Sequence, residues 1–509
     1  MTRLPVAALI AAAMTAHTGD VMLAASPRSC ESLRSLELTA GAVTLAETVG
    51  AGEFRSAGPT APPAAFEKLP SFCRVAATLR PSPDSDIKIE VWLPAADWNG
   101  KFVAVGNGGW AGTISYAAMA EVLGRGYSTV STDTGHVGGS GAFVLGHPEK
   151  LVDFGYRAVR EMTVVAKRIV ESRYGTSPRH SYWNGCSTGG RQGLTEARRF
   201  PEDYDGMIVG APATPRPLLN GWHLSLVNAA LKDPAAFIPV EKHAVVHRAV
   251  VAACDALDGL KDGLIADPRK CRFDPSVLEC RGEDGPGCLT ARQIATVRSL
   301  MSPLLDKTGV EIFPGWEPGS ELGWRAVIAG PEPTSLTVDN YKYVVFKNAA
   351  WDWKTFDAER DIAAAWKADD DGIVDVREPD VTRFVGRGGK MLMYHGWSDP
   401  LVPPRASIDK FVHIQQALGG AAKAGQSVRL FMAPGMGHCA GGEGPNTFDA
   451  IGALEAWVER GTPPSRIVAS HLANGRVDRT RPLCPYPQVA TYSGAGNPDT
   501  DASFTCREP

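Results

Sequence analysis

The chain has 509 residues, of which 44% are hydrophobic, enough for a large apolar core and an inserted domain. Its formal net charge of −4 argues against nucleic acid or an anionic membrane surface as a partner. After the N-terminal segment, no apolar run reaches the length of a membrane-spanning helix, so no membrane span is expected.

The N-terminus has the pattern of a secretory leader. An arginine at position 3 precedes an apolar run over residues 4–16, and Ala24-Ala25 is a candidate cleavage site. The pattern predicts a signal peptide over residues 1–25 and a secreted or periplasmic mature protein. The ten cysteines then indicate disulfides rather than a metal site.

Strand-like and helix-like patterns alternate in the first half of the chain. Residues 87–93 alternate apolar and polar side chains like an edge strand. Residues 102–105 have a buried-strand pattern, residues 127–130 and 207–209 are interpreted as further parallel strands, and residues 156–172 have helical periodicity. The alternation predicts an α/β fold with a mostly parallel sheet.

The pentapeptide Gly185-Cys186-Ser187-Thr188-Gly189 follows an apolar run and leads into a helix-like segment. Gly-x-Ser-x-Gly between a strand and a helix is typical of the nucleophile elbow, a sharp turn that exposes one hydroxyl at the end of a parallel sheet. The glycines fit, because side chains there would clash with neighbouring backbone. Taken alone, a serine between glycines is usually only a turn.

Two further residues complete a catalytic set. Asp399 and His438 each follow an apolar, strand-like run, and the chain order Ser, Asp, His is that of α/β-hydrolases. Hydroxyl, imidazole and carboxylate supply a nucleophile, a base and an anion that orients the base. The sequence predicts the triad Ser187, Asp399 and His438. His395 is the rival base, but its place in a strand end favours a packed side chain.

A glycine-rich loop over residues 106–112 follows an apolar strand. In α/β-hydrolases this place supplies the second amide of the oxyanion hole. We expect Gly108 and Gly109 as candidates for that amide and the Thr188 amide as the first donor. The alternative, a phosphate-binding loop, lacks both the Lys-Ser/Thr pair and the dinucleotide fingerprint.

Cys186 and Cys439 adjoin the predicted nucleophile and base. Because those two triad members must come within hydrogen-bond reach, a disulfide between the cysteines is expected. The alternative, Cys186 as the nucleophile, is disfavoured in an oxidising compartment. Local spacing favours four more pairs, although sequence does not establish connectivity: Cys30–Cys73, Cys254–Cys271, Cys280–Cys288 and Cys484–Cys506.

Cys-Ser at the elbow, Gly-Trp-Ser-Asp at the acid and Gly-His-Cys at the base closely resemble the tannase and feruloyl esterase family. That family also includes the hydrolase of mono(2-hydroxyethyl) terephthalate, and the resemblance runs from about Cys30 to the C-terminus. It implies a secreted serine esterase with an α/β-hydrolase core, a large lid and the disulfides proposed above. It also implies a structural calcium ion in the lid.

The loop at residues 254–264 spaces three carboxylates along Asp-Gly turns, which present the oxygens that calcium prefers. It is not an EF-hand, because no glutamate closes it, and by themselves Asp-Gly pairs are mostly turns. With the resemblance, we expect Asp255, Asp258 and Asp262 to bind calcium through side chains, and Leu260 and Leu264 through carbonyls. No organic cofactor is expected.

Residues 212–385 break the strand–helix alternation and carry four of the ten cysteines. We expect them to form a lid inserted between two parts of the core, residues 26–211 and 386–509. Most lid aromatics should fill its own core, with one or two available to stack on an aromatic acyl group. The lid aromatics considered are Trp222, Tyr341, Tyr343, Phe346, Trp351 and Trp353.

The sequence therefore predicts a secreted serine carboxylic ester hydrolase that acts on small aromatic esters, feruloyl-esterase-like, through an acyl-enzyme. Tannase activity and hydrolysis of mono(2-hydroxyethyl) terephthalate are alternatives within the same chemistry. An alternative of another class is an inactive homologue that binds phenolics or carbohydrate, and the intact triad argues against it.

Overall fold

A computed structural model describes residues 1–2, 27–56, 63–110 and 112–509, so the predicted signal peptide lies almost wholly outside the described residues. A ten-stranded sheet forms the centre, in the order β1-β2-β3-β4-β6-β5-β7-β8-β11-β12. The strands from β6 to β12 run parallel, and β1 to β4 extend the sheet antiparallel. The strands are β1 (Glu37–Leu38), β2 (Gly41–Val49), β3 (Phe72–Leu79), β4 (Ile87–Pro94), β5 (Lys101–Val105), β6 (Ser128–Thr132), β7 (His180–Cys186), β8 (Gly206–Gly210), β11 (Lys390–Gly396) and β12 (Val428–Ala433).

The sequence patterns place these strands well, but the expectation of an edge strand at residues 87–93 was wrong. Strand β4 lies between β3 and β6 inside the sheet. Its polar residue Glu90 is buried, and it binds Arg74 on β3 at 2.6 Å and the Tyr116 hydroxyl at 2.7 Å. At Glu90 the alternation therefore reflects a buried side chain paired with Arg74 and Tyr116, not exposure to solvent.

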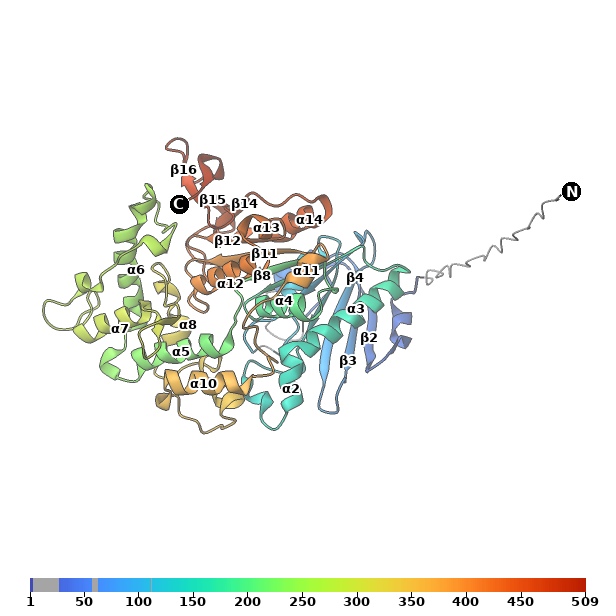
Figure 1. Cartoon of the computed structure of the whole chain (residues 1–509), viewed down its shortest axis with the longest axis horizontal. Coiled ribbons are helices and arrows are strands. Elements are labelled where there is room, and N and C mark those ends of the chain that lie inside the picture. The colour runs from blue at the N-terminus through green and yellow to red at the C-terminus, as the bar shows by residue number, and fades with distance from the viewer. Residues whose placement is uncertain (3–26, 57–62, 111) are drawn as a thin grey trace.

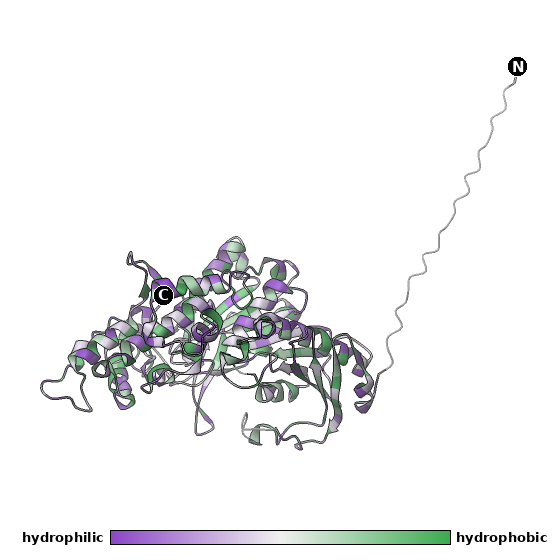
Figure 2. Cartoon of the chain, turned by 90° about the horizontal axis from the view of Figure 1, so that it is seen from below, coloured by the Kyte–Doolittle hydropathy of each residue, from purple (hydrophilic) through white to green (hydrophobic). Residues whose placement is uncertain are grey.

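Helices cover both faces of the sheet, and each face has its own apolar core. Figure 2 shows hydrophobic residues along the strands and hydrophilic residues on peripheral helices and loops. On one face lie α1 (Tyr116–Leu123) and α14 (Ala450–Arg460). The other face carries α3 (Ala158–Tyr174), α4 (Thr188–Arg199) and α12 (Pro404–Ala417). Three short helices also belong to the main domain: α2 (Pro148–Val152), α11 (Thr382–Gly386) and α13 (Ala421–Ala424). The layers are those of an α/β-hydrolase.

Strands β8 and β11 pair directly, so the chain between them leaves the sheet and returns. Figure 1 shows this insertion as a helical body beside the sheet. It has an apolar core of its own, and its role as a lid stays a prediction. Its last part, with Val376, Val381 and Phe384, packs in the core of the main domain. The lid elements are α5 (Arg216–Leu231), α6 (Val240–Cys254), α7 (Ala291–Met301), α8 (Arg325–Ile328), α9 (Ser335–Asp339), α10 (Ala358–Ala368), β9 (Leu304–Leu305) and β10 (Glu311–Phe313).

The C-terminal residues form two small antiparallel sheets beside β12. The strands are β13 (Thr447–Phe448), β14 (Ile467–Ala473), β15 (Arg476–Leu483), β16 (Val489–Tyr492) and β17 (Phe504–Arg507). Disulfides join all ten cysteines in the five predicted pairs: Cys30–Cys73, Cys186–Cys439, Cys254–Cys271, Cys280–Cys288 and Cys484–Cys506. In the described part of the chain, no helix is both long enough and apolar enough to cross a bilayer.

Candidate active site

Ser187 stands at the turn between β7 and α4, and its backbone is strained, with φ 63° and ψ −122°. Side-chain-bearing residues adopt such angles only where the surrounding structure holds them there, and they cluster at functional sites. The turn is tight: a Cβ on Gly185 would lie 2.5 Å from the Gly189 carbonyl oxygen, and one on Gly190 would lie 2.3 Å from that of Gly210. The local geometry is that of a nucleophile elbow.

Asp399 follows β11, is fully buried and fixes the ring of His438. His438 Nδ1 lies 2.6 Å from Asp399 Oδ2, and the amides of Leu401 and Val402 donate to Oδ1 at 2.7 and 2.9 Å. Burial alone would raise the pKa of Asp399, but the charge of His438 and the hydrogen bonds from His395 and His438 hold that pKa well below its usual range. The carboxylate assigns the ring proton to Nδ1, which leaves Nε2 to accept a proton from a nucleophile.

Ser187 and His438 line the same cavity, which has a volume of about 220 Å³. In this conformation no hydrogen bond joins these two described side chains. Such contacts are often loose without substrate and tighten in the reacting complex. The arrangement therefore has the chain order of a triad and the contact between His438 and Asp399, and the contact between Ser187 and His438 stays a prediction.

His395, the rival base, is fully buried at the end of β11, as its position in the sequence favours. Its Nε2 lies 3.0 Å from both Asp399 Oδ2 and the Val402 carbonyl oxygen, and its Nδ1 lies 2.7 Å from the Ser407 hydroxyl. Two acceptors at Nε2 assign the proton to that nitrogen. His395 does not line the Ser187 cavity, so it serves as a second donor to Asp399 and is not placed to act as a base.

The predicted oxyanion donors line the same cavity as Ser187, the predicted nucleophile. Gly108, Gly109 and Thr188 all line the Ser187 cavity. Within the described residues, none of their three amides has a hydrogen-bond acceptor. Unpaired amides beside a nucleophile are the groups that stabilise a developing oxyanion. The choice between the two glycines stays a prediction.

The glycine loop is held against the elbow by hydrogen bonds that sequence reasoning missed. The Thr188 hydroxyl donates to the Gly109 carbonyl at 2.8 Å. The Gln192 side chain of α4 accepts from the Asn107 amide and donates to the Asn107 side chain, each at 3.1 Å. These contacts fix the loop relative to the same helix that presents Ser187.

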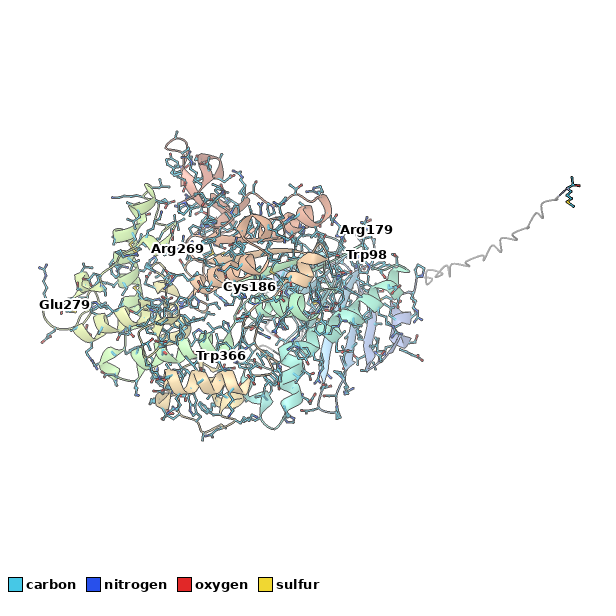
Figure 3. The ribbon with its side chains drawn as sticks, in the orientation of Figure 1. Trp98, Arg179, Cys186, Arg269, Glu279 and Trp366 are labelled. Atoms are coloured by element: carbon cyan, nitrogen blue, oxygen red, sulfur yellow. A yellow bond between two sulfur atoms is a disulfide. The ribbon has the colours of Figure 1, made fainter. Side chains whose placement is uncertain are left out.

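The Cys186–Cys439 disulfide joins the neighbours of Ser187 and His438. The two residues are 253 positions apart, and their Cα atoms lie 5.9 Å apart. Figure 3 shows Cys186 in the middle of the molecule, where the sheet meets the lid. A bridged cysteine has no thiolate, so Cys186 is not available as a nucleophile.

A second cavity, of about 680 Å³, is also lined by His438. Leu401 and His438 line both cavities, and lid residues such as Arg325 and Leu322 line only the larger one. Ser187 lies in the wall of the smaller cavity alone. An ester bound across His438 could therefore place its two halves in different cavities.

A sequence model of tannase and feruloyl esterase matches residues 73–507. The chain belongs to the tannase and feruloyl esterase family. It is 36% identical to an uncharacterised esterase of Xanthomonas campestris pv. campestris over 95% of this chain and 92% of that one. It is 34% identical to a probable feruloyl esterase B-2 of Aspergillus fumigatus over 85% of this chain and 86% of that one.

The crystal structure of feruloyl esterase B from Aspergillus oryzae superposes with a TM-score of 0.88 at 32% identity. The superposition covers 94% of this chain and 99% of that chain. The family is one of esterases, and the α/β-hydrolase fold predicted from the sequence is confirmed. The chain is therefore an esterase by family.

None of the six predicted lid aromatics lines the Ser187 cavity. Trp222, Tyr341 and Trp353 are buried in the lid core. The cavity wall is instead aliphatic, with a polar group of three side chains from α5: Arg216, Asn220 and His223. Their spacing of four and three residues, which puts them on one helix face, is a signal that the sequence held.

His247 on α6 connects the lid to the loop of the predicted base. Its Nδ1 lies 2.7 Å from Glu321 and its Nε2 lies 2.7 Å from Glu443, five residues after His438. Burial lowers the pKa of His247, but the hydrogen bonds to both carboxylates outweigh it and raise that pKa to about 9. The charged ring therefore bridges lid and loop at neutral pH.

The loop over residues 254–264, where calcium is predicted, contains groups that fit a cation. Partial burial and the charges of Asp262 and Asp255 raise the pKa of Asp258. Among the described residues, the carbonyl oxygens of Leu260 and Leu264 accept no hydrogen bond. The three carboxylates and two carbonyls offer the hard oxygen ligands that calcium takes.

Two observations limit that fit. Arg481 already pairs with Asp262 at 2.6 Å. In the described residues, only Cys280, Asp284 and Cys288 bring three ligand atoms within 4.8 Å of one another, and those cysteines are bridged. A bound ion must therefore draw the three aspartates closer together, and calcium stays a prediction.

Proposed function

We propose that the protein is a secreted serine carboxylic ester hydrolase that cleaves esters of small aromatic acids of the hydroxycinnamic type. One observation carries the proposal: strained Ser187 shares a cavity with His438, and buried Asp399 anchors that histidine. This combination supports attack by a serine hydroxyl.

In the proposed reaction, Ser187 Oγ attacks the ester carbonyl while His438 Nε2 takes the hydroxyl proton. Asp399 keeps the imidazole oriented and stabilises its charged form. The amides of Thr188 and of Gly108 or Gly109 stabilise the oxyanion. His438 then protonates the leaving alcohol, and water releases the acid from the acyl-enzyme.

The two cavities support a division of the substrate. The cavity of about 220 Å³ beside Ser187 suits a small acyl group, being below the range of about 300–1,000 Å³ common for drug-sized ligands. The larger cavity across His438 suits the alcohol. Residues from the lid line both.

Secretion is supported by the leader pattern and by the five disulfides, which persist in oxidising compartments. A calcium ion held by Asp255, Asp258 and Asp262 with the Leu260 and Leu264 carbonyls would hold the lid loop in one conformation. The loop contributes no side chain to the Ser187 cavity, so the proposed role of the ion is structural.

The nucleophile is tested by Ser187→Ala in the purified mature protein, with a nitrophenyl ester as substrate. Turnover should fall by about six orders of magnitude, as for triad residues that act as a unit, while circular dichroism stays unchanged. Substantial activity in that variant, with inhibition by thiol alkylation, would instead identify Cys186 as the nucleophile.

The substrate class is tested by comparing kcat/KM for methyl ferulate, methyl gallate and mono(2-hydroxyethyl) terephthalate. The proposal expects methyl ferulate to be the best of the three. A clear preference for either of the others would move the assignment within the family. No Ser187-dependent hydrolysis of any ester would favour the inactive phenolic- or carbohydrate-binding homologue.

A further inference from the structure

The glycine loop after β5 lies directly against the first turn of α4. A Cβ on Gly106 would lie 2.6 Å from the Cα of Gly189, which is two residues after Ser187. The Gly189 amide donates to the Asn107 carbonyl at 2.8 Å. The loop therefore rests on the same stretch of backbone that presents the predicted nucleophile.

The side chain of Gln192 on α4 holds Asn107 at two points. The Asn107 backbone amide can only donate, so it assigns Gln192 Oε1 as its acceptor at 3.1 Å and leaves Nε2 to donate to Asn107 Oδ1, also at 3.1 Å. Asn107 Nδ2 donates to the carbonyls of Thr132, at the end of β6, and Thr113 at 2.8 and 3.2 Å. Asn107 and Gln192 are 5% and 1% exposed. Breaking this network would leave buried polar atoms unpaired, which is costly, so the network resists rearrangement.

These bonds fix the orientation of the peptide unit between Asn107 and Gly108. In a planar trans peptide, the carbonyl and the following N–H point in opposite directions. The bond from Gly189 to the Asn107 carbonyl therefore also sets the direction of the Gly108 amide. Gly108 is exposed and lines the Ser187 cavity, and its amide has no acceptor among the described residues. It is a donor held in one orientation and left without a partner.

The peptide unit of the alternative donor, the Gly109 amide, is not held in this way. Within the described part of the chain, neither the Gly108 carbonyl nor the Gly109 amide takes part in a hydrogen bond. The Thr188 hydroxyl binds the Gly109 carbonyl, which belongs to the next peptide unit. Donors stabilise an oxyanion best when they need no reorganisation, so the geometry favours the Gly108 amide over that of Gly109.

We propose that Asn107 and Gln192 are positioning residues for ester hydrolysis, because they hold the Gly108 amide in place as the second donor to the oxyanion. Neither residue lines the Ser187 cavity, so both act through the Gly108 peptide unit. This inference rests on the proposed esterase function and adds how its oxyanion site is held in shape. The effect should fall on kcat and not on KM, since negative charge on the carbonyl oxygen develops only in the transition state.

The test measures hydrolysis of a nitrophenyl ester by Gln192→Met and Gly106→Ala. The first variant removes both side-chain bonds to Asn107 at similar side-chain length. The second keeps every donor and acceptor but adds a methyl group where the Gly189 backbone leaves no room. Each should lower kcat about ten- to a hundredfold with KM nearly unchanged, since a displacement of about 1 Å costs about a hundredfold. If circular dichroism shows that one variant does not fold, the other still tests the proposal.

Thr195→Val is the matched control on the same helix. The buried Thr195 hydroxyl donates to the Arg191 carbonyl at 2.9 Å, within α4 and away from the loop. This substitution removes a buried hydrogen bond from the helix, so it should lower the melting temperature but keep the wild-type kcat. An equal loss of kcat in Thr195→Val would overturn the proposal, as would a wild-type kcat in Gln192→Met.

A trifluoromethyl ketone tests the oxyanion role directly. Ser187 Oγ adds to its carbonyl carbon, His438 takes the hydroxyl proton, and the carbonyl oxygen becomes an oxyanion. The inhibition constant should therefore rise in Gln192→Met by the same factor by which kcat/KM falls. The matching methyl ketone, which stays trigonal, should bind the wild type and this variant equally. An unchanged inhibition constant for the fluorinated ketone would show that the pair does not act on the oxyanion.

Hydrogen exchange at single amides keeps the two proposals distinguishable, because it needs no turnover. The Asn107 amide, which donates to Gln192, should exchange about tenfold faster in Gln192→Met than in Thr195→Val or the wild type, the effect of roughly one hydrogen bond. Equal exchange rates would mean that Gln192 does not hold the loop. If the wild type hydrolyses no ester, the proposed function fails, and this exchange rate still decides whether the pair holds the loop. If the wild type is active and Gln192→Met keeps its kcat, only the positioning proposal fails.

Discussion

Removing the Cys186–Cys439 disulfide should affect both stability and catalysis. The bridge closes a loop with a sequence separation of 253 residues. In the chain-entropy model a loop of that length contributes about 5 kcal/mol, because the cross-link restricts the unfolded chain. The double variant Cys186→Ala/Cys439→Ala should lose that amount of unfolding free energy and leaves no unpaired thiol behind.

The lid offers a matched control. Cys280–Cys288 closes a separation of 8 residues, far from Ser187, for which the same model gives about 2.5 kcal/mol. Guanidinium unfolding followed by tryptophan fluorescence compares the two double variants. We expect the first to lose about twice as much stability as the second, which should keep the wild-type kcat.

The effect on catalysis is specific to the first variant. Without the bridge, the loop of His438 is no longer tied to the elbow, and a displacement of about 1 Å at a reacting group can cost about a hundredfold in rate. We expect kcat to fall by about ten- to a hundredfold. Equal stability losses in the two variants would refute the entropy argument, and a wild-type kcat would refute the positioning role.

Three further predictions concern residues around the site. His395→Phe should lower kcat about ten- to a hundredfold with little change in KM, because Asp399 loses a charged hydrogen bond. His395→Gln should recover part of the loss, and equal kcat values in the two variants would contradict this role. His247 has its pKa raised to about 9 from about 6.5 in the unfolded chain, so it should contribute about 3 kcal/mol below pH 6.5 and lose it as pH rises through 9. Thermal melting of wild type and His247→Gln should therefore differ at low pH and converge above that range. Chelation of calcium should lower the melting temperature while changing initial turnover at mild temperature less. Asp258→Ala should abolish that response to the chelator. Metal analysis that finds no calcium in the purified protein would refute the site.

The sequence predicted those features of the protein that short local motifs encode. Ser187, Asp399 and His438 each follow a strand, and parallel strands bring their carboxyl ends to one edge of the sheet. The Cys186–Cys439 pairing follows from that same convergence, because each cysteine adjoins a residue of the triad. At these positions the local sequence motif and the strand topology place the same residues together, so the motif alone was enough to predict them.

Other features depend on contacts that local pattern does not encode. The alternation in β4 looked like an edge strand, because the partners of Glu90 come from β3 and α1, which only the folded sheet brings together. The bridge from His247 to Glu443 depends on how the lid docks on the main domain. Arg216, Asn220 and His223 share a helix face, yet three polar residues at that spacing equally fit an exposed surface.

The lid has two structural roles at this site, and they are coupled. Helix α5 leaves the sheet directly after β8 and supplies the polar end of the Ser187 cavity. Elsewhere the lid contacts the loop of His438, through His247 to Glu443 and through Leu264, which packs against Gly435. Lid substitutions that alter the second set of contacts should therefore change kcat for every ester. Substitutions confined to the cavity face of α5 should change the preference among acyl groups, so the two kinds of effect are separable by position.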